Sequence, residues 1–381
     1  MKNFLKIFLY FLPFIYALIR IKNDIIFYLI FLIIWGLLFL YHIILKKNLS
    51  LSIQIGITLL FLDLTFHKIN YKLFFSSINL INWEYIPILF IYPFIFLLIR
   101  AYKWKYLLTH IKKISLINLY DATIVGFMAN SIFPARLGEL IRAYMLGEKE
   151  KISKSTIFAT IVLERVSDGL IIGLFIIYIF LFNPINNTFF LKIGKMGIFV
   201  YILVIILIIL FYKYKNSITN FINKYLKFLK FITHFFDSFY EGLHILNNSK
   251  DLIIYLFLSI ILWFVTIHYT YLLLHSMDLT IILQHINKNH FYISLLLLVM
   301  MALGYSIPSG PGALGPLQAS IVFTFIMLDS SLKTDIKRYN ILAYFSLYIW
   351  LIQILPLILG GIIVLIKDKI NLKSLQHNER R

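Results

Sequence analysis

The sequence predicts an all-α, polytopic membrane protein with about 8–10 spans, including two re-entrant or broken helices. Apolar and aromatic residues make up 61% of the 381 residues and charged residues only 14%, whereas about a quarter of the residues in soluble domains are charged. The apolar residues form runs of about 20, such as the uncharged run Ile25–Leu45, which is the length that crosses a bilayer. No run alternates with period 2, which excludes a membrane β-barrel.

Eleven apolar segments follow from this pattern. They cover residues 4–19, 25–45, 51–66, 84–102, 117–133, 156–182, 195–212, 252–274, 290–307, 316–329 and 340–366. The first segment follows Lys2 and Lys6 and is succeeded by Arg20 rather than by a small-residue cleavage site. We therefore expect a retained first helix and not a removed signal peptide.

The segments divide into an N-terminal transmembrane hairpin (1–50), a main membrane domain (51–368) and a basic cytoplasmic tail (369–381). The longest loop, 213–250, is too short for a soluble domain. Within it, Phe221–Phe236 combines lysines at spacing three with a run of aromatic residues. This pattern fits an amphipathic helix on the membrane surface or an ordinary basic connector.

Lysine and arginine gather in segments 100–113, 135–154 and 213–250 and in the tail. Short basic loops stay on the cytoplasmic side, so we expect both termini in the cytoplasm of a cell-membrane protein. Two of these basic segments flank 117–133, which should then enter and leave on one side as a re-entrant element. By the same reasoning, 316–329 is re-entrant from the opposite side.

The net charge of +19 is attributed to these loops and to contact with anionic lipid, rather than to nucleic acid. The chain has no cysteine, and His42, His268 and His285 lack the spacing of metal ligands. Nucleotide-binding glycine motifs and nucleophile elbows are also absent from the sequence. We therefore expect no metal and no cofactor.

The stretch Gly126–Leu146 contains the first group of candidate functional residues. They are Asn130, Pro134, Arg136, Gly138, Glu139 and Arg142. Pro134 should break the preceding helix. Arg136, Glu139 and Arg142 are spaced three apart and share one side of the next helix. Their positive excess suits a lipid phosphate, although a solvated helix start with intrahelical ion pairs would show the same spacing.

The second group lies inside the segment 156–182. Glu164 and Asp168 are four residues apart on one helix face, and Arg165 is adjacent. Ionisable groups at this depth must pair with one another or face water. Their negative excess predicts contact with the arginines of the first group. The pairing could be a salt bridge between helices or a relay for protons or substrate.

The third group is the segment Ile307–Gln318, which has three prolines and three glycines. The candidate residues are Pro308, Pro311, Gly312, Gly315 and Gln318. This composition predicts an unwound stretch whose backbone lines a cavity, or a plain turn near the surface. Arg100 and Trp104, at the end of 84–102, are expected only to snorkel and to anchor the helix at the interface.

In this order the motifs resemble the membrane domain of lysyl-phosphatidylglycerol synthases (multiple peptide resistance factor), which also occurs as stand-alone flippase-like proteins. The likeness runs from about Ile53 to Ile366 and rests on four stretches, Arg100–Trp104, Asn130–Arg142, Glu164–Asp168 and Pro308–Gly315. Two positions depart from the family pattern. Ala313 stands where the family usually has glycine, and Gln318 where it usually has glutamate.

The resemblance implies a lipid flippase or lipid transporter for phospholipids or other lipid phosphates. The soluble synthase domain of the two-domain members has no room here, so no enzymatic activity is expected. Fitting partners are membrane phospholipids, a separate lipid-modifying enzyme and further copies of the chain. Two other functions remain open, a membrane-embedded transferase acting on lipid-phosphate donors and a non-transporting membrane partner of a separate synthase.

Overall fold

The computed structural model describes residues 49–133, 137–182, 209–221 and 249–368, with scattered positions elsewhere between 199 and 240. These residues form helices and turns and no strand, apart from one isolated bridge between Ile81 and Met277. Several predicted features lie wholly or partly outside them. These are the segments 4–19, 25–45 and 195–212, the amphipathic stretch 221–236, the residues Pro134 and Arg136, and the tail 369–381.

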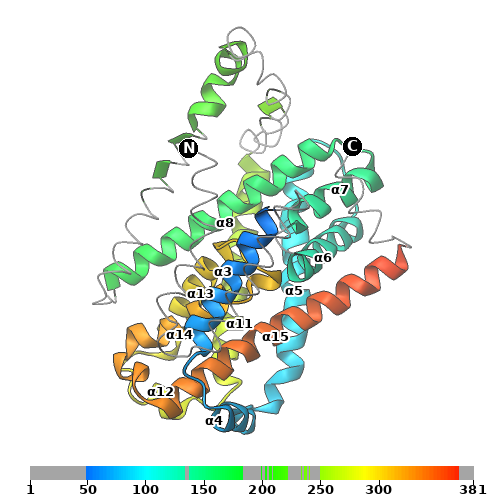
Figure 1. The fold of residues 1–381 in the computed structure, drawn as a ribbon. Helices are drawn as coiled ribbons and strands as arrows, with labels where there is room; N and C mark the ends of the chain where they lie inside the picture. Colours follow the sequence, from blue (N-terminus) through cyan, green and yellow to red (C-terminus); the bar gives the residue numbers. More distant parts are fainter. Residues whose placement is uncertain are drawn as a thin grey trace.

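Nine longer helices build most of the described part of the chain (Figure 1). They are α3 (Leu49–Phe66), α5 (Ile86–Leu108), α6 (Leu116–Ile132), α7 (Gly138–Glu150), α8 (Lys154–Phe182), α11 (Ser249–His275), α13 (His290–Ser306), α14 (Pro316–Leu328) and α15 (Ile336–Lys367). Short helical turns connect them. These are α4 (Tyr71–Ser76), η1 (Ser77–Leu80), η2 (Trp83–Tyr85), α12 (Thr280–Leu283), η6 (Pro311–Ala313) and η7 (Ser330–Lys333).

Five of the described helical stretches are long and apolar enough to cross a membrane. They are Trp83–Leu108, Lys154–Phe182, Lys250–His275, Pro311–Leu328 and Ile336–Lys367. This result confirms the predicted class of polytopic helical membrane protein. The expected total of about 8–10 spans remains a prediction, because several of the counted segments lie outside the described residues.

One predicted boundary was wrong in a way that matters. The sequence suggested that the fourth segment ends at 102 and that a basic loop, 100–113, follows. Instead, α5 continues to Leu108, and Arg100 and Lys103 belong to this helix and are buried in the protein. The apolar residues Leu107 and Leu108 prolong the buried face past the charges.

The helices α6 and α7 form the first hairpin. Glu150, the last residue of α7, contacts Lys112 and Asn118 at distances of 2.8 and 2.7 Å, so that both ends of this hairpin lie on one side of the bundle. On the same side, Lys149 pairs with Asp368, which follows α15, and Lys367 at the end of α15 pairs with Asp121 in α6. We call this the Lys367 side.

The helices α13 and α14 form the second hairpin, which opens on the opposite side. His290, at the start of α13, lies 3.2 Å from His275 at the end of α11. Asp329, after α14, pairs with Arg338 in the first turn of α15 at 3.0 Å. We call this the Lys337 side. The stretch Pro311–Leu328 has the length of a span only when η6 is counted with α14, and the positive φ of Gly312 and Gly315 interrupts it. The 13 continuous residues of α14 alone rise only about 20 Å at about 1.5 Å per residue, which is too short to cross the hydrocarbon core.

The tip of the second hairpin reaches the interior of the bundle. Trp350, near the middle of α15, donates a hydrogen bond from Nε1 to the carbonyl oxygen of Gly312 at 3.1 Å. The turn η6 also contacts α6 of the first hairpin. Both predicted re-entrant elements are therefore broken hairpins that enter from opposite sides and meet inside the protein.

The two hairpins belong to two modules with the same order of elements. The first module is α5, the first hairpin and α8, and the second is α11, the second hairpin and α15. One apolar core is built mainly from the first module and another mainly from the second. Because the hairpins open on opposite sides, the modules are inverted relative to each other, as in many transporter folds.

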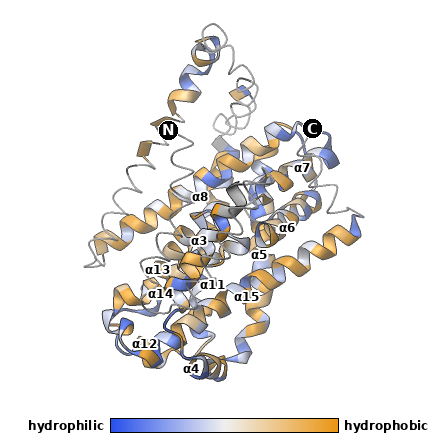
Figure 2. Ribbon diagram, in the orientation of Figure 1, coloured by the Kyte–Doolittle hydropathy of each residue, from blue (hydrophilic) through white to orange (hydrophobic). Residues whose placement is uncertain are grey.

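Hydropathy follows this arrangement (Figure 2). The long helices α8 and α15 carry mostly hydrophobic residues along their length, while hydrophilic residues concentrate near α7 and around α12. Side-chain caps fix several helix starts. Asn289 Oδ1 accepts a hydrogen bond from Tyr292 N at 2.8 Å, and Asp335 Oδ1 accepts one from Arg338 N at 3.0 Å.

Candidate functional site

A cluster of five buried charged residues lies between α5, α7 and α8. Its members are Arg100, Lys103, Arg142, Glu164 and Asp168. Each of them is at most 5% exposed. Because charges at such depth are costly unless they are paired, the geometry of this cluster decides what it can bind. We refer to it as the buried charge cluster.

Arg100 lies between the two carboxylates of α8. Its Nη1 pairs with Glu164 Oε1, and its Nη2 lies 2.8 Å from Asp168 Oδ2. Lys103, one helical turn further along α5, places its Nζ 2.9 Å from Asp168 Oδ1. The spacing of three residues on α5 thus matches the spacing of four on α8, and the two helices are joined by three ion pairs.

Arg142 reaches the cluster from the first hairpin. Its Nη1 donates to Glu164 Oε1 at 3.3 Å, and its Nη2 lies 3.1 Å from Glu164 Oε2. The guanidinium carbon lies 3.7 Å from the centroid of the Trp104 ring, a stacking contact that suits arginine. Trp104 is in turn fixed by a hydrogen bond from Nε1 to Thr160 Oγ1 at 2.9 Å.

Glu139 and Arg165 form the partly exposed rim of the cluster. Arg165 Nη2 lies 3.1 Å from Glu139 Oε1, and its Nη1 lies 3.8 Å from Asp168. The Arg165 side chain is 39% exposed. The prediction that the charged residues of 136–142 and 164–168 meet is therefore confirmed for the described residues, through Arg142 with Glu164 and Glu139 with Arg165.

The buried charges do not balance within the described part of the chain. Arg100, Lys103 and Arg142 face only Glu164 and Asp168, which leaves one positive charge uncompensated. The rim pair of Glu139 and Arg165 is neutral and does not change this excess. Arg142 Nε is a buried donor without a partner, and Nη2 has only its ion-pair contact with Glu164 Oε2, which is not a hydrogen bond. The cluster is therefore a cationic site in which Arg142 has hydrogen-bonding capacity to spare.

Glycines bring α7 close enough to α6 to deliver Arg142. A Cβ on Gly138 would collide with the backbone oxygen of Gly126 and with the side chain of Asn130. Asn130 Oδ1 accepts a hydrogen bond from Gly138 N at 2.8 Å, which orients the start of α7. Asn130 thus positions the hairpin, and the direct contact with a lipid phosphate expected from the sequence remains a prediction.

The third predicted group forms the buried break of the second hairpin and not a surface turn. Gly310 N donates to Thr58 Oγ1 and Gly315 N to Gln318 Oε1, both at 2.7 Å. Gly312, Gly315 and Gln318 are buried, while Pro308 and Pro311 are exposed. Gln318 Nε2 is buried without a hydrogen-bond partner. Among the described residues, no hydrogen bond or ion pair joins this break to the buried charge cluster.

Arg100 and Trp104 overturn one sequence expectation. They were expected to snorkel and to anchor the helix at the interface, but Arg100 is 3% exposed and Trp104 is completely buried. Lys103 and Tyr255 were missed altogether. Tyr255 shares a hydrogen bond of 2.5 Å with Ser167, and its ring lies 4.9 Å from Lys103 Nζ. The one local pattern that indicates burial of Lys103 is that positions 100, 103, 104 and 107 share a helix face.

The fold and the cluster define a polytopic helical membrane protein with an ion-pair network inside the membrane domain. The family described as lysylphosphatidylglycerol synthase TM region matches residues 49–360, and the chain belongs to that family. This confirms the resemblance inferred from the motifs.

A curated relative gives a weaker match. The UPF0104 membrane protein MJ1595 of Methanocaldococcus jannaschii is 26% identical over 212 residues, which is 52% of this chain and 63% of that protein. The chain therefore matches less than two thirds of the relative's length. No solved structure matches the chain.

Proposed function

We propose that the protein moves lipids that carry a phosphate between the two leaflets of the membrane. The observation that supports this function is the uncompensated positive charge of the buried charge cluster. An ion buried without a partner has an effective penalty of several kcal/mol. A lipid phosphate would supply the missing anion, and it would do so at a depth where lipid and not water is the neighbouring solvent.

Arg142 is the group proposed to hold the phosphate. Its Nε has no partner, and Nη2 on the same edge makes an ion-pair contact with Glu164 Oε2 but no hydrogen bond. This edge is the one that binds two oxygens of a phosphate at once. Glu164 and Trp104 fix the orientation of this group before the lipid arrives. Arg136 lies outside the described residues and remains a predicted second ligand, and Glu139 with Arg165 would border the entrance.

The two hairpins would provide the route. The break of the second hairpin contacts α6 of the first, and non-helical backbone at this depth is tolerated where it lines a cavity or is covered by protein. We assign the Lys367 side to the cytoplasm, because Lys112, Lys149 and Lys154 gather there. No enzymatic activity is proposed, and a separate lipid-modifying enzyme would supply any modified lipid.

The test is lipid translocation in reconstituted vesicles. Fluorescent phospholipid in the outer leaflet is bleached with dithionite, and the rate at which inner-leaflet lipid becomes accessible is measured. We expect Arg142→Lys to slow this rate about tenfold, because lysine keeps the charge but loses the fork geometry that holds two oxygens. The variant should still fold, since the pairing with Glu164 can persist.

Arg338→Lys is the matched control. Like Arg142, Arg338 is mostly buried and paired with carboxylates, in its case Asp329 and Asp335. It lies on the Lys337 side, outside the buried charge cluster. Its replacement should leave the rate unchanged. Wild-type rates no faster than those of protein-free vesicles would overturn the proposed function, and equal rates for Arg142→Lys and wild type would overturn the role of Arg142.

A further inference from the structure

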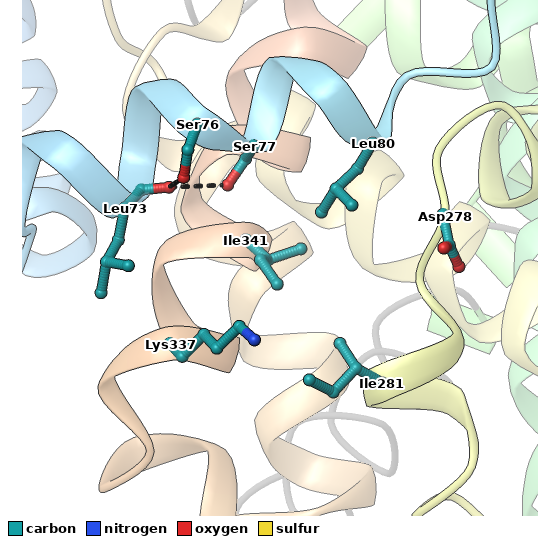
Figure 3. Close-up of a pocket in the computed structure, with 8 residues that line it drawn as sticks. All are labelled: Leu73, Ser76, Ser77, Leu80, Asp278, Ile281, Lys337 and Ile341. Atoms are coloured by element: carbon teal, nitrogen blue, oxygen red, sulfur yellow. Dashed lines mark hydrogen bonds between the residues drawn. The ribbon is translucent and has the colours of Figure 1, made fainter.

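A second candidate site lies far from the buried charge cluster. A cavity of about 300 Å³ opens between α4 with η1, the turn before α12 and the first turns of α15 (Figure 3). This volume is at the lower end of the ~300–1,000 Å³ range of small-molecule sites. Aliphatic side chains such as Leu73 and Ile341 form part of its wall, and its polar groups are Ser76, Ser77, Asp278 and Lys337.

The cavity lies on the Lys337 side of the protein. Lys337 is the second residue of α15, whereas Lys367 ends this helix of 32 residues. At about 1.5 Å per residue, the two lysines are about 45 Å apart along the helix axis. The cavity therefore belongs to the leaflet opposite to the one that adjoins Lys112 and Lys149.

Aromatic residues next to the cavity place it at the level of the lipid headgroups. Tyr71 is 77% exposed, and Phe75 and Trp83 are each 65% exposed. Tyr71 and Phe75 belong to α4, which also supplies Leu73 and Ser76 to the cavity. Exposed aromatic side chains on a short surface helix are typical of the boundary between the hydrocarbon core and water.

The two charges of the cavity are opposite in sign and are not joined to each other. Lys337 makes no ion pair with any described residue, while its neighbour Arg338 pairs with two carboxylates. Asp278 Oδ1 accepts a hydrogen bond from Thr280 N at 3.0 Å. The hydrogen bonds from the Thr280 side chain and backbone hold the pKa of Asp278 below its usual range, so this carboxylate is ionised at neutral pH.

The serines add acceptors and not donors. Ser76 Oγ and Ser77 Oγ both donate to the carbonyl oxygen of Leu73, at 2.9 and 3.0 Å, as the dashed lines in Figure 3 show. With the hydroxyl protons committed, their free lone pairs can only accept. The cavity thus offers one cationic donor, Lys337, and three acceptor groups.

We infer that this cavity binds a phospholipid headgroup that carries both a phosphate and an ammonium group. Lys337 would bind the phosphate, and Asp278 and the buried Ser77 would accept from the ammonium. The exposed Ser76 would lie at the edge of the bound headgroup without being needed for it. The aliphatic wall would contact the glycerol and the first acyl carbons. An anionic headgroup without an amine would leave Asp278 facing it with a like charge. Headgroup binding at this site can be tested separately from lipid transport, because binding is measured in micelles, which have no leaflets.

The test uses the absence of cysteine from the chain. Ser76→Cys introduces a single thiol at the cavity, and the rate of its reaction with a maleimide reports occupancy. In micelles containing phosphatidylethanolamine we expect the rate to fall about tenfold, the loss of access that tight headgroup binding produces. Phosphatidylglycerol should slow it less than about twofold. The control is Lys72→Cys, an exposed position on α4 outside the cavity, which should react equally fast with either lipid.

Charge variants in the Ser76→Cys background assign the contacts. Lys337→Gln should abolish protection by phosphatidylethanolamine. Asp278→Asn retains an oxygen for Thr280 N and should make the two lipids equally protective. Equal protection by both lipids in the parent, or protection that survives Lys337→Gln, would overturn the site. Soluble phosphoethanolamine serves as a further arm, since protection as strong as that by the lipid would overturn the lipid assignment.

Discussion

The two hairpins have the same architecture but are stabilised by different chemistry. Each consists of two short helices, and each returns to the side from which it came. The first hairpin contributes Arg142 to a network of ion pairs with α8. The second hairpin is held at its break by neutral hydrogen bonds from Gly310, Gly315 and Trp350.

Close backbone approach is common to both hairpins and therefore does not explain the difference. A Cβ on Gly138 would meet the backbone of Gly126, and one on Gly304 in the second hairpin would crowd Ser320 and the carbonyl oxygen of Pro316. Small residues are the usual means by which helices pack closely in membranes. What differs is the group that makes the stabilising contact. In the first hairpin it is a charged side chain, and in the second it is the backbone amides of the break.

The comparison indicates that substitutions in an ion-pair network and in a hydrogen-bonded break destabilise the protein for different reasons. Removing one charge from the network of the first hairpin leaves the oppositely charged partners buried without a counter-charge in a low-dielectric environment. Removing one hydrogen bond from the break leaves a neutral group unpaired, with a cost of about 1–3 kcal/mol. The first hairpin should therefore be sensitive to charge and the second to backbone conformation, and each of the following predictions tests one side of this contrast.

The largest effect is expected at Glu164, the carboxylate shared by Arg100 and Arg142. Glu164→Gln leaves both arginines without this partner and should lower the free energy of unfolding by about 3–5 kcal/mol. The measurement is denaturant unfolding in mixed micelles. Glu148→Gln is the matched control, because Glu148 is exposed and pairs only with Lys154, and its loss should change stability by less than about 1 kcal/mol. A similar cost for both variants would contradict the importance of the network.

A smaller effect is expected where the first hairpin packs most tightly. Gly138→Ala should push α7 away from Gly126 and Asn130 and cost about 1–3 kcal/mol. It should also slow lipid translocation, because Arg142 moves with α7. Gly173→Ala is the control, since a Cβ at that position on α8 meets nothing within 4 Å, and it should stabilise the helix by up to about 1 kcal/mol. An unchanged stability of Gly138→Ala would show that the two helices are free to separate.

Local sequence patterns predicted much of the fold. The predicted segments 117–133 and 316–329 agree closely with α6 and α14, because proline, glycine and polar residues mark the breaks on the chain itself. The meeting of Arg142 with Glu164 also followed from the sequence, since two opposite excess charges inside a membrane domain have few other partners.

Arg100 and Lys103 could not be assigned correctly for a physical reason. A lysine or arginine at the end of an apolar segment gives the same local sequence pattern whether its side chain snorkels to the interface or forms an ion pair inside the protein. The carboxylates that decide between the two are 64 to 68 residues away in the chain. Charge pairs of this kind depend on how α5 and α8 pack, which the pattern of neither helix reveals.

The smallest effect concerns the break of the second hairpin and has the opposite sign. Ala313 adopts φ = 56°, the left-handed region that costs a residue with a Cβ about 1–2 kcal/mol, and glycine is the usual residue at this position in the family that the chain resembles. Ala313→Gly should raise the free energy of unfolding by up to about 1 kcal/mol, because the relief of strain exceeds the extra freedom of glycine in the unfolded chain.

The control for this prediction is Ala343→Gly, a buried alanine in the interior of α15. Glycine in a regular helix should lower stability there by about 1 kcal/mol, so the two alanine-to-glycine changes are expected to have opposite signs in the same unfolding measurement. If both variants lose stability, the positive φ at Ala313 is relieved in the membrane. The second hairpin would then not be limited by backbone conformation, and its contrast with the first hairpin would be reduced to charge alone.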